Sequence, residues 1–80
     1  MRIYNEDENK TINNLTLLLT MKEANELIES IKGIIKRNKQ NDHEHINDQE
    51  CNHEITISIY NENNTNEYNQ RIQEVIKNDK

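Results

Sequence analysis

The stretch TMKEANELIESIKGIIKR, residues 20–37, decides the fold of this chain. Thr20 and Glu23 match a capping box, in which the threonine side chain accepts a backbone hydrogen bond and the glutamate reaches back to the cap. Apolar residues then recur at helical spacing, while most charged residues lie on the other side. The pattern predicts an amphipathic helix over residues 21–37. Its apolar stripe consists of Ala24, Leu27, Ile28, Ile31, Ile34 and Ile35.

Two other stretches alternate apolar and polar residues with a period of two, which is typical of half-buried strands. The first, within residues 11–20, carries Leu15, Leu17 and Leu19. The second, within residues 53–60, carries Ile55, Ile57 and Ile59. A short N-terminal strand over residues 2–4 is expected to pair with the first stretch as a hairpin. A final helix is expected from a cap at Thr65 or Asn66 to about Lys77.

The order of these elements, β-β-α-β-α, predicts a single small α+β domain over residues 1–80. Six apolar strand residues need cover, and the two helical stripes are the only cover that the sequence offers. We therefore expect one three-stranded sheet with both helices on one face. The polar stretch 38–52, which holds histidine and cysteine residues, is expected to be a loop between the long helix and the last strand.

The apolar supply of the chain is small. Hydrophobic residues make up 31% of 80 residues, against about 45–50% in typical globular domains. A chain of this length buries only about 60% of its unfolded surface, so its core alone stabilises it marginally. The single cysteine excludes an internal disulfide. The remaining means of support are a metal ion or self-association, and we expect a homodimer more than a metal.

Charge and composition restrict the partners. The net charge of −5 argues against direct nucleic-acid binding, because phosphates require a broad basic surface. No apolar run approaches the roughly 20 residues of a membrane helix. The lone cysteine and the absence of an export signal predict a cytoplasmic protein. Asn, Lys and Ile are abundant, as AT-rich codons would produce, which suggests a low-GC bacterium or its phage as the source.

All three histidines and the only cysteine lie between positions 43 and 53. His and Cys side chains bind most transition metals in proteins, and zinc accepts mixed nitrogen and sulfur ligands. The candidate ligands are His43, His45, Cys51 and His53. Their spacing matches no familiar zinc motif, so the alternative is a solvated polar loop. A catalytic thiol is not expected, because Cys51 is surrounded by carboxylates and lies before a strand, not at the start of a helix.

The predicted sheet leaves one face uncovered, where a second chain could bind. The candidate partner-binding residues on that face are Leu18, Thr56, Ser58 and Tyr60. The chain is therefore interpreted as a small, acidic, non-enzymatic protein-interaction module. It could be an accessory or phage-type inhibitor of a larger protein, perhaps one that binds nucleic acid through a basic groove. The alternative function is a module that binds zinc or another transition metal through the window from His43 to His53.

Overall fold

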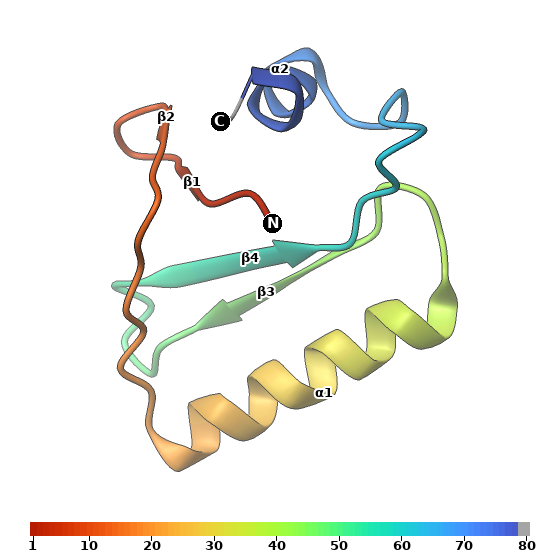
Figure 1. Cartoon of the computed structure of the whole chain (residues 1–80). Coiled ribbons are helices and arrows are strands. Elements are labelled where there is room, and N and C mark those ends of the chain that lie inside the picture. Colours follow the sequence, from red (N-terminus) through yellow and green to blue (C-terminus); the bar gives the residue numbers. More distant parts are fainter. Residues whose placement is uncertain (79–80) are drawn as a thin grey trace.

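The computed structural model describes residues 1–78 and shows two helices and four short strands (Figure 1). The strands form two separate two-stranded antiparallel sheets, β1 with β2 and β3 with β4. The α+β class predicted from the sequence is confirmed, and the single three-stranded sheet is wrong. The elements in chain order are β1 (Tyr4–Asn5), β2 (Lys10–Thr11), α1 (Met21–Arg37), β3 (His43–Asn47), β4 (Glu54–Ser58) and α2 (Gln70–Asn78).

Helix α1 spans the predicted residues and begins with the predicted capping box. Thr20 Oγ1 accepts a hydrogen bond from the Glu23 N–H at 3.2 Å, and Glu23 Oε1 accepts one from the Thr20 N–H at 2.9 Å. Asn38 ends the helix in the left-handed conformation, with φ of 49°, and its N–H donates to the Ile34 carbonyl. Asparagine adopts this conformation more readily than most residues. Local hydrogen bonds therefore define both ends of the helix.

Strands β3 and β4 form a hairpin whose two faces differ in polarity. Residues directly opposite each other share a face, and Ile46 lies opposite Ile55 while His45 lies opposite Thr56. The face with Ile46 packs against α1, where Ile34 is 3% exposed and Ile46 is 5% exposed. Among residues 1–78 these are the only two buried hydrophobic side chains. The core therefore lies between α1 and β3 and is very small.

Strand β3 corrects the prediction of a loop over residues 38–52. His43–Asn47 pairs along its whole length with β4, and Ile46 gives the strand one apolar side chain to bury. Polar residues around Ile46 hid this strand in the sequence. The turn that follows is closed by Asp48, whose carboxylate accepts hydrogen bonds from the N–H groups of Asn52 and His53 at 2.7 and 3.2 Å.

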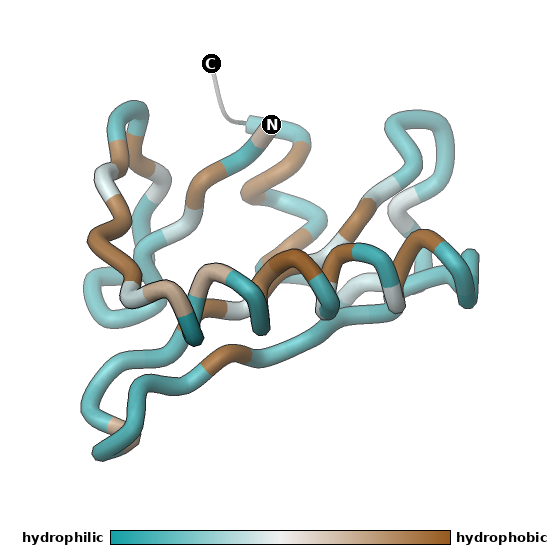
Figure 2. Tube along the Cα trace, turned by 90° about the horizontal axis from the view of Figure 1, so that it is seen from below, coloured by the Kyte–Doolittle hydropathy of each residue, from teal (hydrophilic) through white to brown (hydrophobic). Residues whose placement is uncertain are grey.

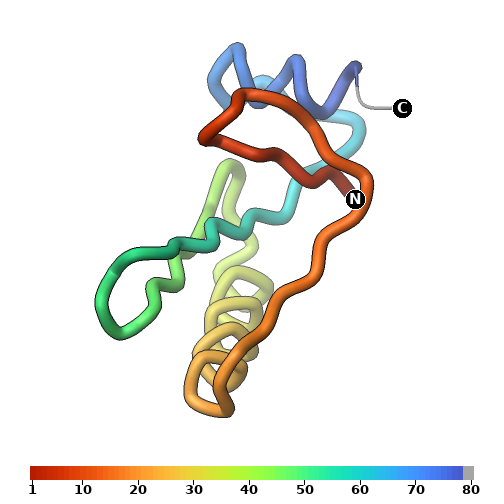
Figure 3. Tube along the Cα trace, turned by 90° about the vertical axis from the view of Figure 1, so that its left-hand side faces the viewer, coloured from red at the N-terminus to blue at the C-terminus, as the bar shows by residue number. Residues whose placement is uncertain are grey.

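The strand predicted within residues 11–20 does not extend beyond β2. Residues 12–20 run from β2 to the start of α1 instead of alongside β4 (Figures 1 and 3). Leu15, Leu17 and Leu18 are exposed there, and Leu18 is 91% exposed. Apolar alternation indicates a strand that could bury one face, but it does not select a partner. In this chain β4 pairs with β3. Residues 15–18, which we call the leucine segment, therefore have no strand beside them.

Helix α2 begins at Gln70, later than predicted, because Asn69 caps it: the Asn69 side-chain oxygen accepts the Ile72 N–H at 2.9 Å. The two helices lie on opposite sides of the hairpin, not on one face (Figures 1 and 3). After β4 the chain crosses to the side of the hairpin opposite α1. There the Tyr68 hydroxyl lies 2.7 Å from Ser58 Oγ on the polar face of β4. No helix within residues 1–78 is long and apolar enough to cross a membrane.

The N-terminal segment and α2 lie in contact, and two interactions within residues 1–78 show how. Arg2 Nε donates to the Ile76 carbonyl at 2.9 Å. The Arg71 guanidinium lies 5.6 Å from the centre of the Tyr4 ring, within the range of a cation–π interaction. None of the residues of α2 is buried. Its attachment therefore depends on surface contacts more than on a shared core.

Candidate functional site

The histidine and cysteine window is divided between strand β3 and the turn after it. His43 and His45 lie on the same face of β3, and their rings meet edge to face with centroids 5.0 Å apart. Cys51 lies at the tip of the turn, exposed and in a left-handed conformation with φ of 57°. His53 follows the turn and precedes β4. The candidate ligands therefore come from two different places on the hairpin.

Two of these histidines are engaged by separate carboxylates. His45 Nδ1 lies 2.8 Å from Glu54 Oε1 and 2.9 Å from Thr56 Oγ1. His53 Nδ1 lies 2.7 Å from Asp48 Oδ2. This hydrogen bond from His53 is the main reason that the pKa of Asp48 is lowered, although partial desolvation opposes the shift. Each imidazole therefore has its own partner, and they do not converge on one point.

The arrangement does not assemble the predicted metal ligands. In the part of the chain that the structure describes, no three or more His, Cys, Asp or Glu side chains are placed to hold a metal ion. His43 and His45 share a strand face, whereas Cys51 and His53 belong to the turn.

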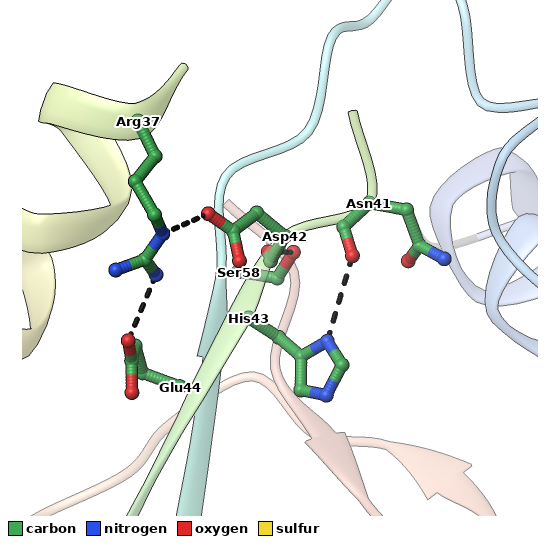
Figure 4. Close-up of polar contacts among 6 residues, drawn as sticks. All are labelled: Arg37, Asn41, Asp42, His43, Glu44 and Ser58. Atoms are coloured by element: carbon green, nitrogen blue, oxygen red, sulfur yellow. Dashed lines mark hydrogen bonds and ion pairs between the residues drawn. The ribbon is translucent and has the colours of Figure 1, made fainter. Parts of the chain in front are cut away.

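An ion-pair cluster connects the end of α1 to the start of β3 (Figure 4). Arg37 Nε lies 2.6 Å from Asp42 Oδ2, and Arg37 Nη2 lies 2.8 Å from Glu44 Oε1. These hydrogen bonds, first to Asp42 and then to Glu44, raise the pKa of Arg37. The bond from Arg37 likewise lowers the pKa of Asp42. We call this group of Arg37, Asp42 and Glu44 the arginine clamp.

Gly33 lies beneath the arginine clamp. A Cβ atom at this position would lie 3.1 Å from Arg37 Nη1 and 3.9 Å from its Cζ. The distance of 3.1 Å is tighter than an ordinary van der Waals contact. A glycine therefore leaves room for the guanidinium to fold back along the helix towards its two carboxylates. The clamp thus ties the last residue of α1 to Asp42, just before β3, and to Glu44 within β3.

The predicted partner-binding residues come from three places in the fold: strand β4, the residues just after it, and the segment before α1. Thr56 and Ser58 are exposed on the polar face of β4, as expected. Ser58 is nevertheless engaged, because its hydroxyl donates to the Asp42 carbonyl at 2.7 Å. Tyr60 is half-buried beyond the end of β4, and Leu18 lies on a different segment.

Sequence reasoning missed how much apolar surface stays uncovered. Within residues 1–78, nine large hydrophobic side chains are exposed. They are Met1, Leu15, Leu17, Leu18, Met21, Ile28, Ile31, Ile35 and Ile59. Two groups stand out: the leucine segment, residues 15–18, and an outer row on α1. The width of the α1 stripe was a signal in the sequence, since one narrow hairpin cannot cover residues on both of its flanks.

A surface groove lies between the first half of α1 and strand β3. Its volume is about 740 Å³, and its lining is mixed. Among the lining residues are Met21, Glu26, Ser30, His45 and Ile46. The groove shows that α1 rests on β3 along part of its length only.

Comparisons of the chain with protein-family models, curated proteins and solved structures found no match.

Proposed function

We propose that this protein works by binding another protein and carries no catalytic activity of its own. The observation that supports this function is the number of large hydrophobic side chains that stay exposed. Among residues 1–78, nine are exposed and only two hydrophobic side chains are buried. Contiguous exposed apolar surface mostly marks interaction sites in small proteins. Binding a partner would bury the surface that the chain cannot cover itself.

The leucine segment is the part that we assign to the partner. Leu15, Leu17 and Leu18 are exposed, and the backbone of the segment has no strand beside it. Burying one leucine side chain contributes about 1.5–3 kcal/mol. Three such side chains in a row would give a partner a compact apolar contact. The single sharpest test position is Leu18, which is 91% exposed and therefore contributes little to the fold.

The charge of the chain indicates the kind of partner. The net charge is −5, and Glu6, Asp7 and Glu8 lie together in the exposed turn between β1 and β2. An acidic surface favours a partner with a basic surface. A nucleic-acid-binding protein has such a surface, and occupying it would make this chain an inhibitor or accessory factor. This extension rests on charge complementarity alone.

The side chains that could do chemistry support a non-enzymatic function. The thiol of Cys51 is exposed on a turn, and in the described part of the chain no histidine lies within hydrogen-bonding distance of it. A nucleophilic cysteine needs a base or a positive charge beside it. His45 and His53 contact carboxylates at exposed positions, and His43 lies 3.5 Å from the Asn41 carbonyl. The geometry thus favours binding over catalysis.

The test compares how well two variants capture a partner. Each variant adds one negative charge, one of them within the leucine segment and the other next to it. Tagged wild-type protein, Leu18→Glu and Asn14→Glu are incubated with lysate of the source cells, and the retained protein is then purified and titrated. We expect a stoichiometric partner that wild type and Asn14→Glu bind alike. Leu18→Glu should bind it at least tenfold more weakly, since about 1.4 kcal/mol corresponds to a factor of ten. Equal binding by both variants would refute the assignment.

The alternative function, a module that binds zinc or another transition metal, is supported by one observation: His43 and His45 share a strand face with rings 5.0 Å apart. Zinc titration of the wild type and of the His43→Ala/His45→Ala variant tests it. Stoichiometric zinc that is lost in the variant would favour the alternative. Weak binding that is unchanged by the substitutions would leave a surface attraction to carboxylates only.

A further inference from the structure

Helix α1 carries two parallel apolar rows, and only one of them is used inside the molecule. The inner row contains Leu27, which is half-buried, and Ile34, which is buried against the hairpin. The outer row contains Met21, Ile28 and Ile35, which follow each other at seven-residue intervals. Exposure separates the rows: Ile34 is 3% exposed, whereas Ile35 is 61% exposed. Figure 2 shows hydrophobic residues recurring along the whole helix.

The outer row has the spacing of a helix–helix seam. Ala24 and Ile31 lie between its members, so apolar residues alternate at intervals of three and four from Met21 to Ile35. This is the a and d pattern of a coiled coil, in which each side chain fits between four residues of a facing helix. Met21 is 78% exposed, Ile28 49% and Ile31 39%. Ala24 is half-buried, and the larger apolar residues of the seam on either side of it are exposed and can receive a second helix.

The charges along α1 identify which helix fits. The first half, residues 21–29, contains three glutamates and one lysine. The second half, residues 30–37, contains two lysines and no acidic residue, and its arginine is already paired with Asp42 and Glu44. A second α1 in antiparallel orientation places the basic half of each helix beside the acidic half of the other. A parallel arrangement would place like charges together, which is unfavourable.

We propose that the outer row of α1 is the interface of an antiparallel homodimer. Ile28 of each copy lies at the two-fold axis, and Met21 of each copy faces Ile35 of the other. In this register Lys32 falls beside Asn25 and Glu29 of the second copy. Lys32 can make these contacts because its ion pair with Glu29 of its own helix is weak. The Lys32 Nζ–Glu29 Oε1 distance is 3.8 Å, and both side chains are well exposed.

The proposal shares with the proposed function only the premise that the uncovered apolar surface is used for binding. The two surfaces are different, since the partner is assigned to the leucine segment and the second copy to α1. A strip on one helix is small beside a stable interface, which buries roughly 600 Å² or more on each partner. The dimer is therefore expected to form reversibly and to depend on protein concentration.

The first experiment is sedimentation equilibrium of the full chain over about two decades of concentration at low ionic strength, where charge complementarity is least screened. We expect a shift from monomer to dimer in the wild type. Ile28→Glu should weaken dimerisation at least tenfold, because it brings two charges together at the two-fold axis. Asn66→Glu adds the same charge far from α1 and should dimerise like the wild type. Far-UV circular dichroism checks that each variant keeps its helices.

Charge-reversed variants test the antiparallel orientation of the two helices. Recovery of dimerisation in a mixture of two variants also shows that neither variant is misfolded. Lys32→Glu/Lys36→Glu makes the outer flank of α1 acidic, and Asn25→Lys/Glu29→Lys makes it basic. Each variant alone should remain monomeric at concentrations where the wild type dimerises, and an equimolar mixture should form a heterodimer. In a Cys51→Ser background, Met21→Cys should form a disulfide with Ile35→Cys in preference to another Met21→Cys chain.

A wild-type chain that stays monomeric throughout would overturn the proposal, as would normal dimerisation of Ile28→Glu or preferential crosslinking between two Met21→Cys chains. These results leave the proposed function intact if Leu18→Glu still loses the captured partner. Conversely, a dimer with unchanged partner capture by Leu18→Glu would retain this inference and reject the assignment of the leucine segment.

Discussion

At the scale of single residues, the arginine clamp explains two features that the sequence leaves unconnected. Gly33 lies in the middle of a helix, where glycine costs roughly 1 kcal/mol relative to alanine. Arg37, one turn later, reaches back across it to Asp42 and Glu44. The glycine therefore gives up helix stability and leaves space for an ion-pair cluster that joins α1 to β3.

The effect of Gly33→Ala should depend on Arg37. In the wild type, the new methyl group would meet Arg37 Nη1 at 3.1 Å, while two carboxylates hold that guanidinium in place. The gain in helix propensity should then be largely cancelled. In an Arg37→Ala background the same change should stabilise the protein by about 1 kcal/mol. Urea denaturation of the four proteins in a double-mutant cycle measures the difference, and equal gains in both backgrounds would contradict the role of the glycine.

The carboxylates of Asp42 and Asp48 should make the fold sensitive to acid. Their pKa values are lowered in the folded chain, Asp42 by its hydrogen bond with Arg37 and Asp48 by that with His53. The unfolded chain therefore binds protons more tightly than the folded chain does. The stabilisation that the two ionised carboxylates give to the fold is complete above the ordinary aspartate pKa of 3.8. It is lost as the pH falls through the lowered values. Urea midpoints measured from neutral pH to about pH 2 should therefore drop most steeply below pH 4.

Asp42→Asn should flatten part of this acid dependence and lower stability at neutral pH. Asp7→Asn is the matched control, since Asp7 lies in an exposed turn outside the ion-pair clusters. If the Asp7 variant flattened the profile as much as the Asp42 variant, the clamp would not be the source of the acid sensitivity.

At the scale of elements, α1 could be predicted to the residue and the sheet could not. The capping box of α1 and the inner row of its apolar stripe are local signals, and both act in the structure. Strand β4 was also visible from its alternation, because its isoleucines alternate with polar residues. Both elements carry their own pattern and need no knowledge of their neighbours.

Strand β3 and the leucine segment show that local sequence patterns do not predict which segments pair as strands. His43–Asn47 contains one apolar residue and reads as a loop, yet pairing with β4 makes it a strand. Residues 15–20 have strong alternation and remain unpaired. Strand pairing depends on which edge is nearby in three dimensions, and period-two patterns do not encode that. For the same reason, the sequence could not show how the four candidate metal ligands are placed relative to one another.

The two adjacent isoleucines near the end of α1 offer a matched test of its inner and outer rows. Ile34→Ala removes one of two buried hydrophobic side chains and should cost roughly 2–5 kcal/mol. Ile35→Ala makes the same change on the exposed row and should alter the stability of the monomer by no more than about 0.5 kcal/mol. Urea denaturation at low protein concentration keeps dimerisation out of the comparison. Similar losses in both variants would show that the hairpin covers the outer row as well.

At the scale of the whole molecule, the chain divides into a part with a core and a part without one. The core lies between α1 and β3, where Ile34 and Ile46 are buried. Helix α2 has no buried residue and is attached to the N-terminal segment by the Arg2 contact to Ile76 and the Arg71 contact to Tyr4. Such surface contacts are worth little individually. The two parts should therefore open with different free energies.

Hydrogen exchange followed by NMR measures this difference directly. Amides in the middle of α1 and in the paired β3 and β4 strands should exchange slowest, with protection close to that of global unfolding. Amides of α2 should exchange much faster, because the helix can fray without disturbing Ile34 and Ile46. Arg71→Ala should raise exchange in α2 further and leave α1 unchanged. If α2 were protected as strongly as α1, the molecule would be one cooperative unit, and the surface contacts of α2 would be far stronger than their exposure implies.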